Sequence, residues 1–384
     1  MFFFIKFNAM KVGYICCDNP FENKKAWSGS IYKLREGIEN AGYEVVWIPY
    51  KPNSFWIRLV CYILRLLLHG KITAYNHNRL IYKLYASSIN EKSEKFRECD
   101  YLFFPCGAQI ALFLKTDKPI ICYADATFKS MINYYWSNLH PWVAREGNKY
   151  EKKAIYRATI NIRASKWAAD SVINDYGFDA GRTFVLPLGP TLNSQDLIPV
   201  KPYQSGTLNV LFSGVEWERK GGDVAVKSVD RLNQLGVKAK LVIVGIRELP
   251  LGYKELPFIE CVGFLDKNIE NQYQQYIETI KRCNILLLPT KAECAGIVFS
   301  EASAFGLPIF TYDTGGISDY VFNGINGYRL PVGSSYIDFA DCIKQVIDSD
   351  EMLKLHKGGI QVYFQKLAWN VWSDSFRKII EKVI

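Results

Sequence analysis

The stretch Ile285-Leu-Leu-Leu-Pro-Thr-Lys-Ala-Glu-Cys-Ala-Gly-Ile-Val-Phe-Ser-Glu-Ala-Ser-Ala-Phe-Gly-Leu-Pro-Ile-Phe-Thr-Tyr312 decides the fold. Its two ends are short, continuous apolar runs, which are typical of strands buried on both faces. The segment between them predicts a helix that begins near Gly296 or Ile297 and ends at Gly306, because glycine commonly follows the last turn of a helix. The stretch therefore predicts a strand–helix–strand unit of a parallel sheet.

Similar apolar runs recur along the whole chain, and segments with helical periodicity, such as Ser30–Ala41 and Asp223–Leu235, separate them. The repetition predicts an α/β class with right-handed crossovers. The strands expected in the first half are Lys11–Cys17, Tyr43–Ile48, Asp100–Pro105, Pro119–Tyr123, Thr159–Arg163 and Thr183–Pro187. Those expected in the second half are Leu208–Ser213, Lys240–Val244, Phe258–Val262, Ile285–Pro289 and Pro308–Tyr312.

The composition changes at residues 189–206, where three prolines, two glycines and two serines indicate a linker. We therefore expect two Rossmann-like, doubly wound domains, at residues 1–188 and 207–365. The tail 366–384 predicts a helix with an apolar stripe, and its return to the first domain is one way to bury that stripe. Ligands of open α/β sheets bind beyond the carboxyl ends of the strands. Two such domains facing each other would share a cleft there.

The composition is that of a globular protein, with 49% apolar, 15% aromatic and 22% charged residues among 384. It excludes long disordered, collagen-like and coiled-coil arrays. The net charge of +9 suits an anionic small molecule, an acidic membrane surface or a nucleic acid, and does not choose among them. The ten cysteines form no CxxC pair, so we expect small buried hydrophobes in a reducing compartment rather than a disulfide framework.

Two apolar segments, the N-terminus and residues 55–68, are candidates for a secretory or membrane-spanning segment. The apolar start is too short for a secretory segment and is interrupted by Lys6, so we expect Met10 to be the functional start and residues 1–9 an upstream extension. No window reaches the ~18 apolar residues that a spanning helix needs. The best candidate, 55–68, has fourteen residues and two arginines.

Two carboxylates in the opening stretch are the first candidates for chemistry. Glu301 falls about one turn inside the expected helix, beside the free amides of Gly296, Ile297 and Val298, which suit a phosphate. There Glu301 can accept hydrogen bonds from vicinal hydroxyls such as those of a ribose, and Glu293 can bind hydroxyls of a sugar. The alternative for Glu301 is a solvated acid that favours the helix dipole.

A second candidate follows the first strand of the second domain. After Gly214, which allows a tight turn, Lys220 can reach an anion at the strand ends and offset the charge that builds on a departing diphosphate. Arg219 is a further candidate cation. The alternative is an ordinary solvated basic loop.

These segments together resemble the retaining glycosyltransferases of family 4, which have the GT-B fold. The resemblance rests on the Glu293-x7-Glu301 pair, on Glu-Ala-x-Ala-x-Gly-x-Pro over 301–308 and on Gly315-Gly316. It covers 207–375 well and 10–190 loosely. Cys294 and Ala295 replace the family's usual Gly-Phe, and Val215 stands where the family has Arg after Gly214.

The resemblance implies a role for each candidate in donor binding. Lys220 would lie at the diphosphate, Glu301 at the ribose and Glu293 at the sugar. The amides of 296–298 would bind phosphate. Gly263 and Phe264, in the loop after the expected strand 258–262, are candidates to hold the base, as is the loop after Val244. Neither a cofactor nor a metal is expected.

The first domain offers two weaker candidates. Gly29 follows the first strand and allows close approach of the backbone, and the resemblance places it at the donor phosphates. A simple alternative is that Ser28 or Ser30 caps the next helix. Asp125 ends a buried strand near the place of a family histidine, and is a candidate for positioning the acceptor or accepting its proton. Its alternative is capping of a helix that starts at Thr127-Phe128.

The function that the resemblance implies is transfer of a sugar from a nucleotide-sugar donor to a hydroxyl of a glycan or lipid-linked acceptor, in cell-surface polysaccharide or glycolipid synthesis. The alternatives are a non-catalytic nucleotide-sugar binding or scaffold protein, and a nucleotide-sugar epimerase or glycogen-type phosphorylase of the same fold. Asp348-Ser-Asp350 is interpreted as a helix end rather than a metal motif. The lack of GxGxxG after the first strand disfavours a dehydrogenase.

The positive charge is concentrated in residues 51–98, which hold nine Lys and Arg against three Glu, an excess of six. This region includes the apolar run 55–68. A basic amphipathic helix with Trp and Leu is typical of a membrane-surface element, and an ordinary helical insertion is the alternative. A nucleic-acid partner is not expected, because no known binding module frames the region. We expect a cytoplasmic protein, with a peripheral position on the inner face of the membrane left open.

Overall fold

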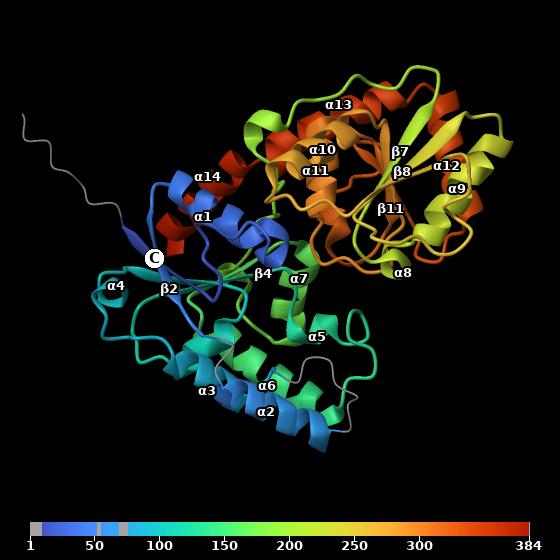
Figure 1. Cartoon of the computed structure of the whole chain (residues 1–384). Helices are drawn as coiled ribbons and strands as arrows, with labels where there is room; N and C mark the ends of the chain where they lie inside the picture. Colours follow the sequence, from blue (N-terminus) through green and yellow to red (C-terminus); the bar gives the residue numbers. More distant parts are fainter. Residues whose placement is uncertain (1–9, 52–54, 69–75, 384) are drawn as a thin grey trace, which may run out of the picture. The chain divides into compact units, whose positions relative to one another are not determined.

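The computed structural model describes residues 10–51, 55–68 and 76–383, and the chain divides into two compact units (Figure 1). Unit 1 comprises Met1–Leu186 and Trp372–Ile384, and unit 2 comprises Pro187–Val371. The expectation that 1–9 form an upstream extension lies outside the described residues. Each unit is built around its own sheet.

Unit 1 contains a six-stranded sheet in the order β2-β1-β3-β4-β5-β6, and every neighbouring pair is parallel. The two central strands, β3 and β4, are almost wholly buried because helices cover both faces of the sheet. The strands are β1 (Lys11–Cys16), β2 (Glu44–Pro49), β3 (Tyr101–Pro105), β4 (Ile120–Ala124), β5 (Ile160–Arg163) and β6 (Thr183–Val185).

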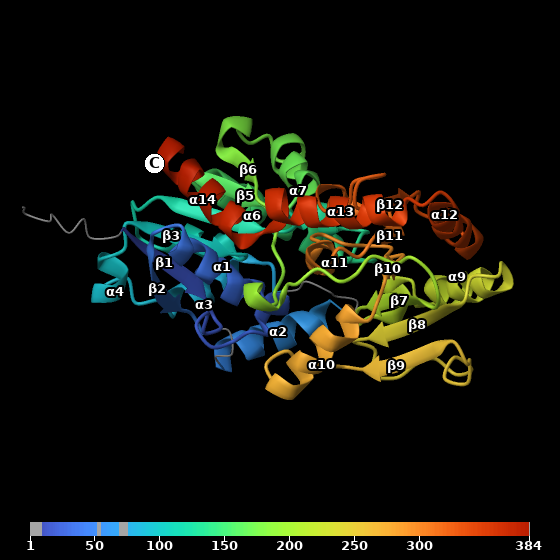
Figure 2. The ribbon, with the colours of Figure 1, turned by 90° about the horizontal axis from the view of Figure 1, so that it is seen from above.

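Unit 2 contains a second six-stranded parallel sheet in the order β12-β11-β10-β7-β8-β9, and Figure 2 shows its labelled strands following one another in this order. The strands are β7 (Leu208–Ser213), β8 (Ala239–Val244), β9 (Ile259–Gly263), β10 (Ile285–Leu288), β11 (Ile309–Tyr312) and β12 (Gly327–Leu330). All eleven predicted strands are therefore confirmed. The twelfth, β12, was not predicted, because Gly-Tyr-Arg-Leu is a half-exposed edge strand without an apolar run.

Helices cover both faces of the unit 1 sheet (Figure 1). Figure 1 shows α1 and α14 above it and α2, α3 and α6 below it. The helices are α1 (Ser30–Asn40), α2 (Phe55–Leu67), α3 (Arg79–Ser87), α4 (Glu94–Arg97), α5 (Phe128–Met131), α6 (Pro141–Arg157), α7 (Lys166–Asp170) and α14 (Trp369–Val383). Short 3-10 turns at Ala26–Gly29 and Ala108–Phe113 follow β1 and β3.

The helices of unit 2 are α8 (Trp217–Lys220), α9 (Gly222–Gln234), α10 (Glu270–Lys281), α11 (Ile297–Phe305), α12 (Tyr336–Asp348) and α13 (Met352–Val362). The predicted boundaries of α11 are confirmed. Gly296 is its N-cap, and Gly306 follows its last residue with a φ of 73°, a left-handed conformation that favours glycine.

The segment that composition indicates as a linker packs onto unit 2. The backbone N–H of Asn193 donates to the hydroxyl of Tyr273 (2.9 Å), and that of Val200 donates to the carbonyl of Phe305 (2.9 Å). The indole N–H of Trp369 donates to the carbonyl of Pro190 (2.7 Å). The prolines and glycines give the segment an irregular backbone, but its hydrogen bonds hold it on the surface of unit 2.

The C-terminal helix completes the core of unit 1. The side chain of Phe376 is fully buried. Its ring meets those of Tyr43 (5.8 Å between centroids), Phe103 (6.0 Å) and Trp372 (5.1 Å, stacked). The hydroxyl of Ser373 donates to the carbonyl of Gly37 (2.8 Å). The near-helical spacing of Trp372, Phe376 and Ile380 thus reflects burial against the sheet and α1.

All ten cysteines are free, and five of them are buried, as the apolar surroundings in the sequence predict. Burial raises the pKa of the Cys99 thiol to about 11. Cys261 differs from the expectation because it is exposed in β9, the edge strand of unit 2. Among the helices of residues 10–51, 55–68 and 76–383, none is long and apolar enough to cross a membrane.

Phe376→Ala should destabilise unit 1 by about 3–5 kcal/mol, because it removes a buried aromatic ring and leaves a cavity. Urea titration followed by hydrogen exchange of unit 1 peptides measures this change. Lys378→Ala, at an exposed position of the same helix, should stay within about 0.5 kcal/mol of the wild type. Equal effects of the two substitutions would show that α14 does not contribute to the core of unit 1.

Candidate functional site

The strand order of unit 2 creates a switch point between β7 and β10. The chain starts at β7, adds β8 and β9 on one side, and then returns to add β10, β11 and β12 on the other. The loops that leave β7 and β10 therefore run to opposite faces of the sheet and leave a crevice at their carboxyl ends, where open α/β sheets bind ligands. Gly214 to Lys220 follow β7, and Glu293 follows β10.

The two loops approach each other because Gly221 has no side chain. Gly221 follows α8 with a φ of 75°, and a Cβ at this position would overlap the carbonyl oxygen of Pro289 at the end of β10. The backbone N–H of Lys291 donates to the carbonyl of Arg219 (2.8 Å) and ties the loops together. A side chain at 221 would separate them.

This close approach places Lys220 and Glu293 in contact. The ammonium of Lys220 donates to Oε2 of Glu293, and the two side chains are 10% and 12% exposed. Gly214 makes room for the lysine, since a Cβ there would lie 2.9 Å from Cγ of Lys220. The loop after β7 is therefore shaped around the lysine stem, and the alternative of an ordinary solvated basic loop is wrong for Lys220.

Arg219 stands beside this pair and has partners of its own. Its guanidinium donates two hydrogen bonds to Glu216 (both 2.9 Å) and one to the carbonyl of Ala292 (2.9 Å). Nη1 lies 3.9 Å from Oε2 of Glu293. The hydrogen bonds from Arg219 lower the pKa of the Glu216 carboxyl. The crevice thus holds two cations and two carboxylates within one continuous set of contacts.

The loops after β8 and β9 lie beside Gly214. Gly245 has a φ of 98°, and a Cβ there would overlap the carbonyl of Gly214. The backbone N–H of Gly245 donates to the carbonyl of Gly263 (2.8 Å), whose φ is 87°. The ring of Phe264 is 43% exposed, with the guanidinium of Arg247 at 5.0 Å from its centroid. A flat ring with an adjacent cation offers a surface on which a planar base can stack.

The amino end of α11 faces the crevice with its first-turn amides. The carbonyl of Gly296 accepts from the amides of Phe299 (2.9 Å) and Ser300 (3.0 Å), as at the start of an ordinary helix. The amides of Ile297 and Val298 precede the first intrahelical donor, and no acidic residue occupies the first turn. The helix start is therefore electrostatically suited to an anion.

Glu301 is buried rather than solvated, so the alternative of a surface acid is wrong. It is 1% exposed. Oε1 accepts from the ammonium of Lys267 (2.8 Å) and the hydroxyl of Thr191 (2.9 Å), and Oε2 accepts from the hydroxyl of Tyr276 (2.7 Å). Burial, and next the charge of Glu301, raise the pKa of Tyr276 well above its ordinary value. The carboxylate is held by three donors from three different segments.

The partners of Glu301 were not predicted. Thr191 belongs to the segment interpreted as a linker, Lys267 to a loop before α10, and Tyr276 to the buried face of α10. The ammonium of Lys267 also lies 4.2 Å from the centroid of the Tyr276 ring. The sequence signal for this network was Tyr276 at a buried helical position, because a buried hydroxyl needs a hydrogen-bond partner.

In unit 1, the structure brings together the loop of Gly29 and Asp125. Gly29 precedes α1 with a φ of 90°, and Trp27 and Ser28 before it also have left-handed φ values, 49° and 56°. The indole N–H of Trp27 donates to Oδ2 of Asp125 (3.2 Å). The loop after β1 therefore reaches the carboxyl end of β4.

Both capping alternatives in unit 1 are wrong. The N-cap of α1 is Gly29, which makes no side-chain cap, and the buried hydroxyl of Ser30 has no hydrogen-bond partner among the described residues. The cap of α5 is Thr127, whose hydroxyl accepts from the amide of Ser130 in a capping box. Asp125 is thus not needed to start α5.

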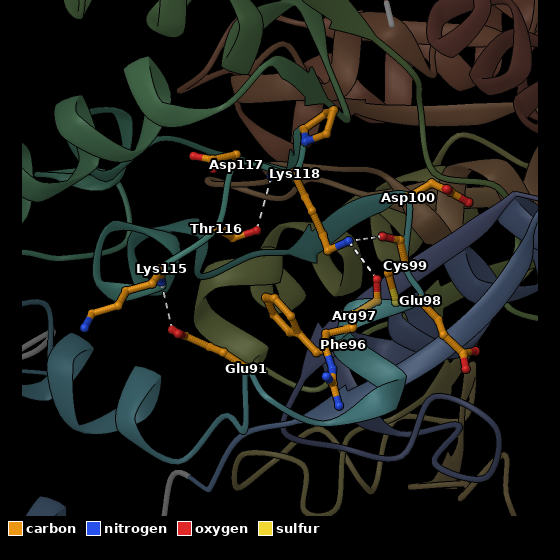
Figure 3. A pocket seen from close by; sticks show the side chains of 11 residues that line it. Glu91, Phe96, Arg97, Glu98, Cys99, Asp100, Lys115, Thr116, Asp117 and Lys118 are labelled. Carbon is orange, nitrogen blue, oxygen red and sulfur yellow. Dashed lines mark hydrogen bonds between the residues drawn. The ribbon is translucent and has the colours of Figure 1, made fainter.

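A cavity of about 580 Å³ opens in unit 1 at the end of the sheet opposite to Asp125 (Figure 3). It lies beside Asp100 and Pro119, which precede β3 and β4, so it is at the amino ends of these strands. The ammonium of Lys118 donates to the carbonyl of Arg97 (3.0 Å) inside it. It contains none of the predicted site residues.

The residues that the structure describes contain no group of three or more His, Cys, Asp or Glu that could hold a metal ion. Asp348 of the DxD sequence accepts from Lys344 one turn earlier in α12 (2.6 and 2.7 Å). The interpretation of that motif as a helix end agrees with this contact.

Lys267→Met should destabilise unit 2 by about 1–3 kcal/mol, because Glu301 stays buried and loses its cation. Urea titration followed by hydrogen exchange of unit 2 peptides measures the change. Lys281→Met breaks an exposed pair with Glu278 and should cost less than about 0.5 kcal/mol. If both variants match the wild type, Lys267 is not what holds Glu301.

The part of unit 2 that carries this crevice is similar to known proteins. Residues 195–357 match the family model described as "Glycosyl transferases group 1". A D-inositol 3-phosphate glycosyltransferase of Paenarthrobacter aurescens is 26% identical over 218 residues, which cover 53% of this chain and 52% of that protein. The chain thus spans about half the length of the curated relatives it matches.

Two solved structures are similar over nearly the whole chain. Sucrose-phosphate synthase of Thermosynechococcus elongatus has a TM-score of 0.67 at 13% identity, covering 97% of this chain and 98% of that one. A protein of Anabaena solved in complex with UDP and glucose has a TM-score of 0.59 at 13% identity, covering 97% and 99%. The predicted fold class is confirmed. The chain has the two parallel-sheet units of the GT-B fold, and residues 195–357 of its second unit are similar to the group 1 glycosyl transferases.

Proposed function

We propose that this chain is a retaining glycosyltransferase that moves a sugar from a nucleotide-sugar donor to a hydroxyl of a glycan or lipid-linked acceptor. The observation that carries the proposal is the contact of Lys220 with Glu293, next to Arg219, at the switch point of unit 2. The named activity of the curated relatives and the UDP and glucose of the Anabaena protein support it. Ten free cysteines favour a reducing, cytoplasmic setting.

The diphosphate of the donor would be bound by Lys220, by Arg219 and by the amides of Ile297 and Val298. An ammonium has three N–H donors, so Lys220 can keep its contact with Glu293 and still donate to a phosphate oxygen. Glu293 would then accept from a hydroxyl of the sugar. During transfer, the bond from the anomeric carbon to the diphosphate breaks, a bond to the acceptor oxygen forms, and the cations stabilise the charge left on the diphosphate.

The hydrogen bonds of Glu301 limit how it would bind a ribose. A carboxylate offers about four acceptor positions, two on each oxygen. Thr191 and Lys267 occupy Oε1, and Tyr276 occupies one position of Oε2. One ribose hydroxyl can therefore be accepted at Oε2 with the network intact. A second would require Lys267 or Thr191 to move, which refines the expectation of two bonds from vicinal hydroxyls.

Asp125 is our candidate for the acceptor side, where it would orient the attacking hydroxyl or take up its proton. It stands at the carboxyl end of β4, is partly exposed and accepts from Trp27. Gly29, in the same loop cluster, would approach the donor phosphates through its backbone. No cofactor or metal is part of this proposal.

The identity of the donor is tested by incubating the purified chain with UDP-, GDP-, ADP- and CMP-sugars. The melting temperature of the protein and the release of the nucleotide are both measured. One sugar nucleotide should raise the melting temperature and be slowly hydrolysed. Lys220→Ala and Glu301→Ala should each lower release by about 100-fold or more, because a charge-stabilising or positioning contact is lost. Lys227→Ala, at an exposed position of α9, should leave the rate unchanged.

Tight donor binding without turnover, with any acceptor supplied, would favour the non-catalytic binder. The exposed Val215, which stands where the resemblance expects an arginine, is the observation on which that second candidate depends.

Asp125→Asn separates the acceptor role from donor binding. The variant should keep the donor dissociation constant within about twofold and lower the turnover number by about 10- to 100-fold, because general-base or positioning contacts act on turnover. Calorimetry and a product assay give the two values. The matched variant Asp117→Asn, which lies at the amino ends of the strands, should alter neither the dissociation constant nor the turnover number. A wild-type turnover number for Asp125→Asn would exclude Asp125 from the reaction.

A further inference from the structure

Helix α2 (Phe55–Leu67) leaves large apolar side chains in the open. Six of them are exposed by between 44% and 67%: Phe55, Trp56, Tyr62, Ile63, Leu66 and Leu67. Ile57 is the buried contact of the helix, at 4% exposure. Burying such a face is worth far more than burying scattered surface residues, so a continuous exposed apolar patch marks an interaction site.

The positions along α2 arrange these side chains in rows. Phe55, Tyr62 and Leu66 are seven and eleven residues apart and lie along one line of the helix. Trp56, Ile63 and Leu67 follow the same spacing and lie on one side of that line. Arg58 and Arg65, seven residues apart and both exposed, lie on its other side. The outward face is therefore an apolar strip with aromatic rings and a border of two arginines.

The charge around α2 has one sign. Residues 51–90 contain six Lys and Arg and no Asp or Glu. In α3, which lies beside α2, the side chains of Arg79 and Lys83 are exposed one turn apart, and Leu80 between them is 49% exposed. Figure 1 shows both helices on the side of the sheet away from α1 and α14. Positive charge thus extends along the whole apolar strip.

We propose that α2, with Arg79 and Lys83 of α3, docks unit 1 on the surface of a bilayer that contains anionic lipids. An apolar strip with aromatic residues inserts at the boundary of headgroups and acyl chains, and arginines at its border reach the phosphates. The helix is about 20 Å long at 1.5 Å per residue, too short to cross the ~30 Å hydrocarbon core. It therefore lies in the plane of the membrane.

The charge also decides against a second copy of this chain as the occupant. A two-fold contact places the same patch on both sides, so Arg58 and Arg65 would meet the same cations of the partner with no carboxylate nearby. Anionic headgroups neutralise every cation of the patch, each contributing to attraction while the ionic strength is low. The membrane proposal does not depend on the proposed transfer of a sugar.

Vesicle sedimentation tests the proposal with the full chain, using phosphatidylcholine vesicles with and without 30% phosphatidylglycerol. The wild type should bind the anionic vesicles at least tenfold more tightly, and more weakly as salt rises. Arg58→Glu/Arg65→Glu should lose at least tenfold. Trp56→Ser/Leu66→Ser should lose binding to both vesicles.

Two matched variants control for net charge and for apolar surface. Lys227→Glu/Lys238→Glu changes the net charge by the same amount on exposed lysines of unit 2, and Leu251→Ser/Val332→Ser removes exposed apolar side chains of that unit. Both should bind vesicles like the wild type. All four variants change exposed residues and should keep the wild-type melting temperature and donor hydrolysis, which separates this test from that of the reaction.

Equal vesicle binding by the wild type and Arg58→Glu/Arg65→Glu would overturn the proposal, as would absence of wild-type binding. Sedimentation velocity gives the remaining outcome. If the wild type forms a dimer that Trp56→Ser/Leu66→Ser dissociates, and does not bind vesicles, the membrane proposal is overturned. The apolar strip is then an interface between two copies of the chain.

Discussion

The site of unit 2 depends on one steric constraint, the approach of the loop after β7 to the end of β10. Gly221 allows it, because any side chain there would overlap the carbonyl of Pro289. The approach brings Lys220 onto Glu293 and places Arg219 beside Ala292. Burying these charges would be costly if they were separate, and their mutual contacts compensate the cost. The electrostatics of the crevice therefore follow from a backbone that only glycine can adopt.

A second buried charge, the carboxylate of Glu301, lies in the helix that follows β10. Glu301 lies in α11, and its three donors come from the segment after unit 1, from the loop before α10 and from α10 itself. The carboxylate consequently joins three parts of unit 2 as well as facing the crevice. Glu301 thus contributes to the structure of unit 2, and our proposed function gives it a role in donor binding as well, so substitutions of Glu301 need a measurement of each.

Much of the fold and of the site was predictable from local sequence. Continuous apolar runs identified eleven of the twelve strands, and the Gly306 cap defined the end of α11. The carboxylates and Lys220 were predictable because they follow strands and match a family pattern. The network of Thr191, Lys267 and Tyr276 was not, since it joins residues up to 110 positions apart in the sequence and no periodicity relates them. Turn composition did not show that residues 189–206 pack on unit 2, because Pro-rich segments can pack as well as link.

The chain passes from unit 1 to unit 2 at residue 187 and returns at residue 372. Phe376, which fills the space between Tyr43 and Phe103, follows the whole of unit 2 in the sequence. Unit 1 is translated first, yet its hydrophobic core lacks this ring until translation of unit 2 is complete. During synthesis the core of unit 1 therefore stays incomplete until Trp372 and Phe376, beyond unit 2 in the sequence, return to its sheet.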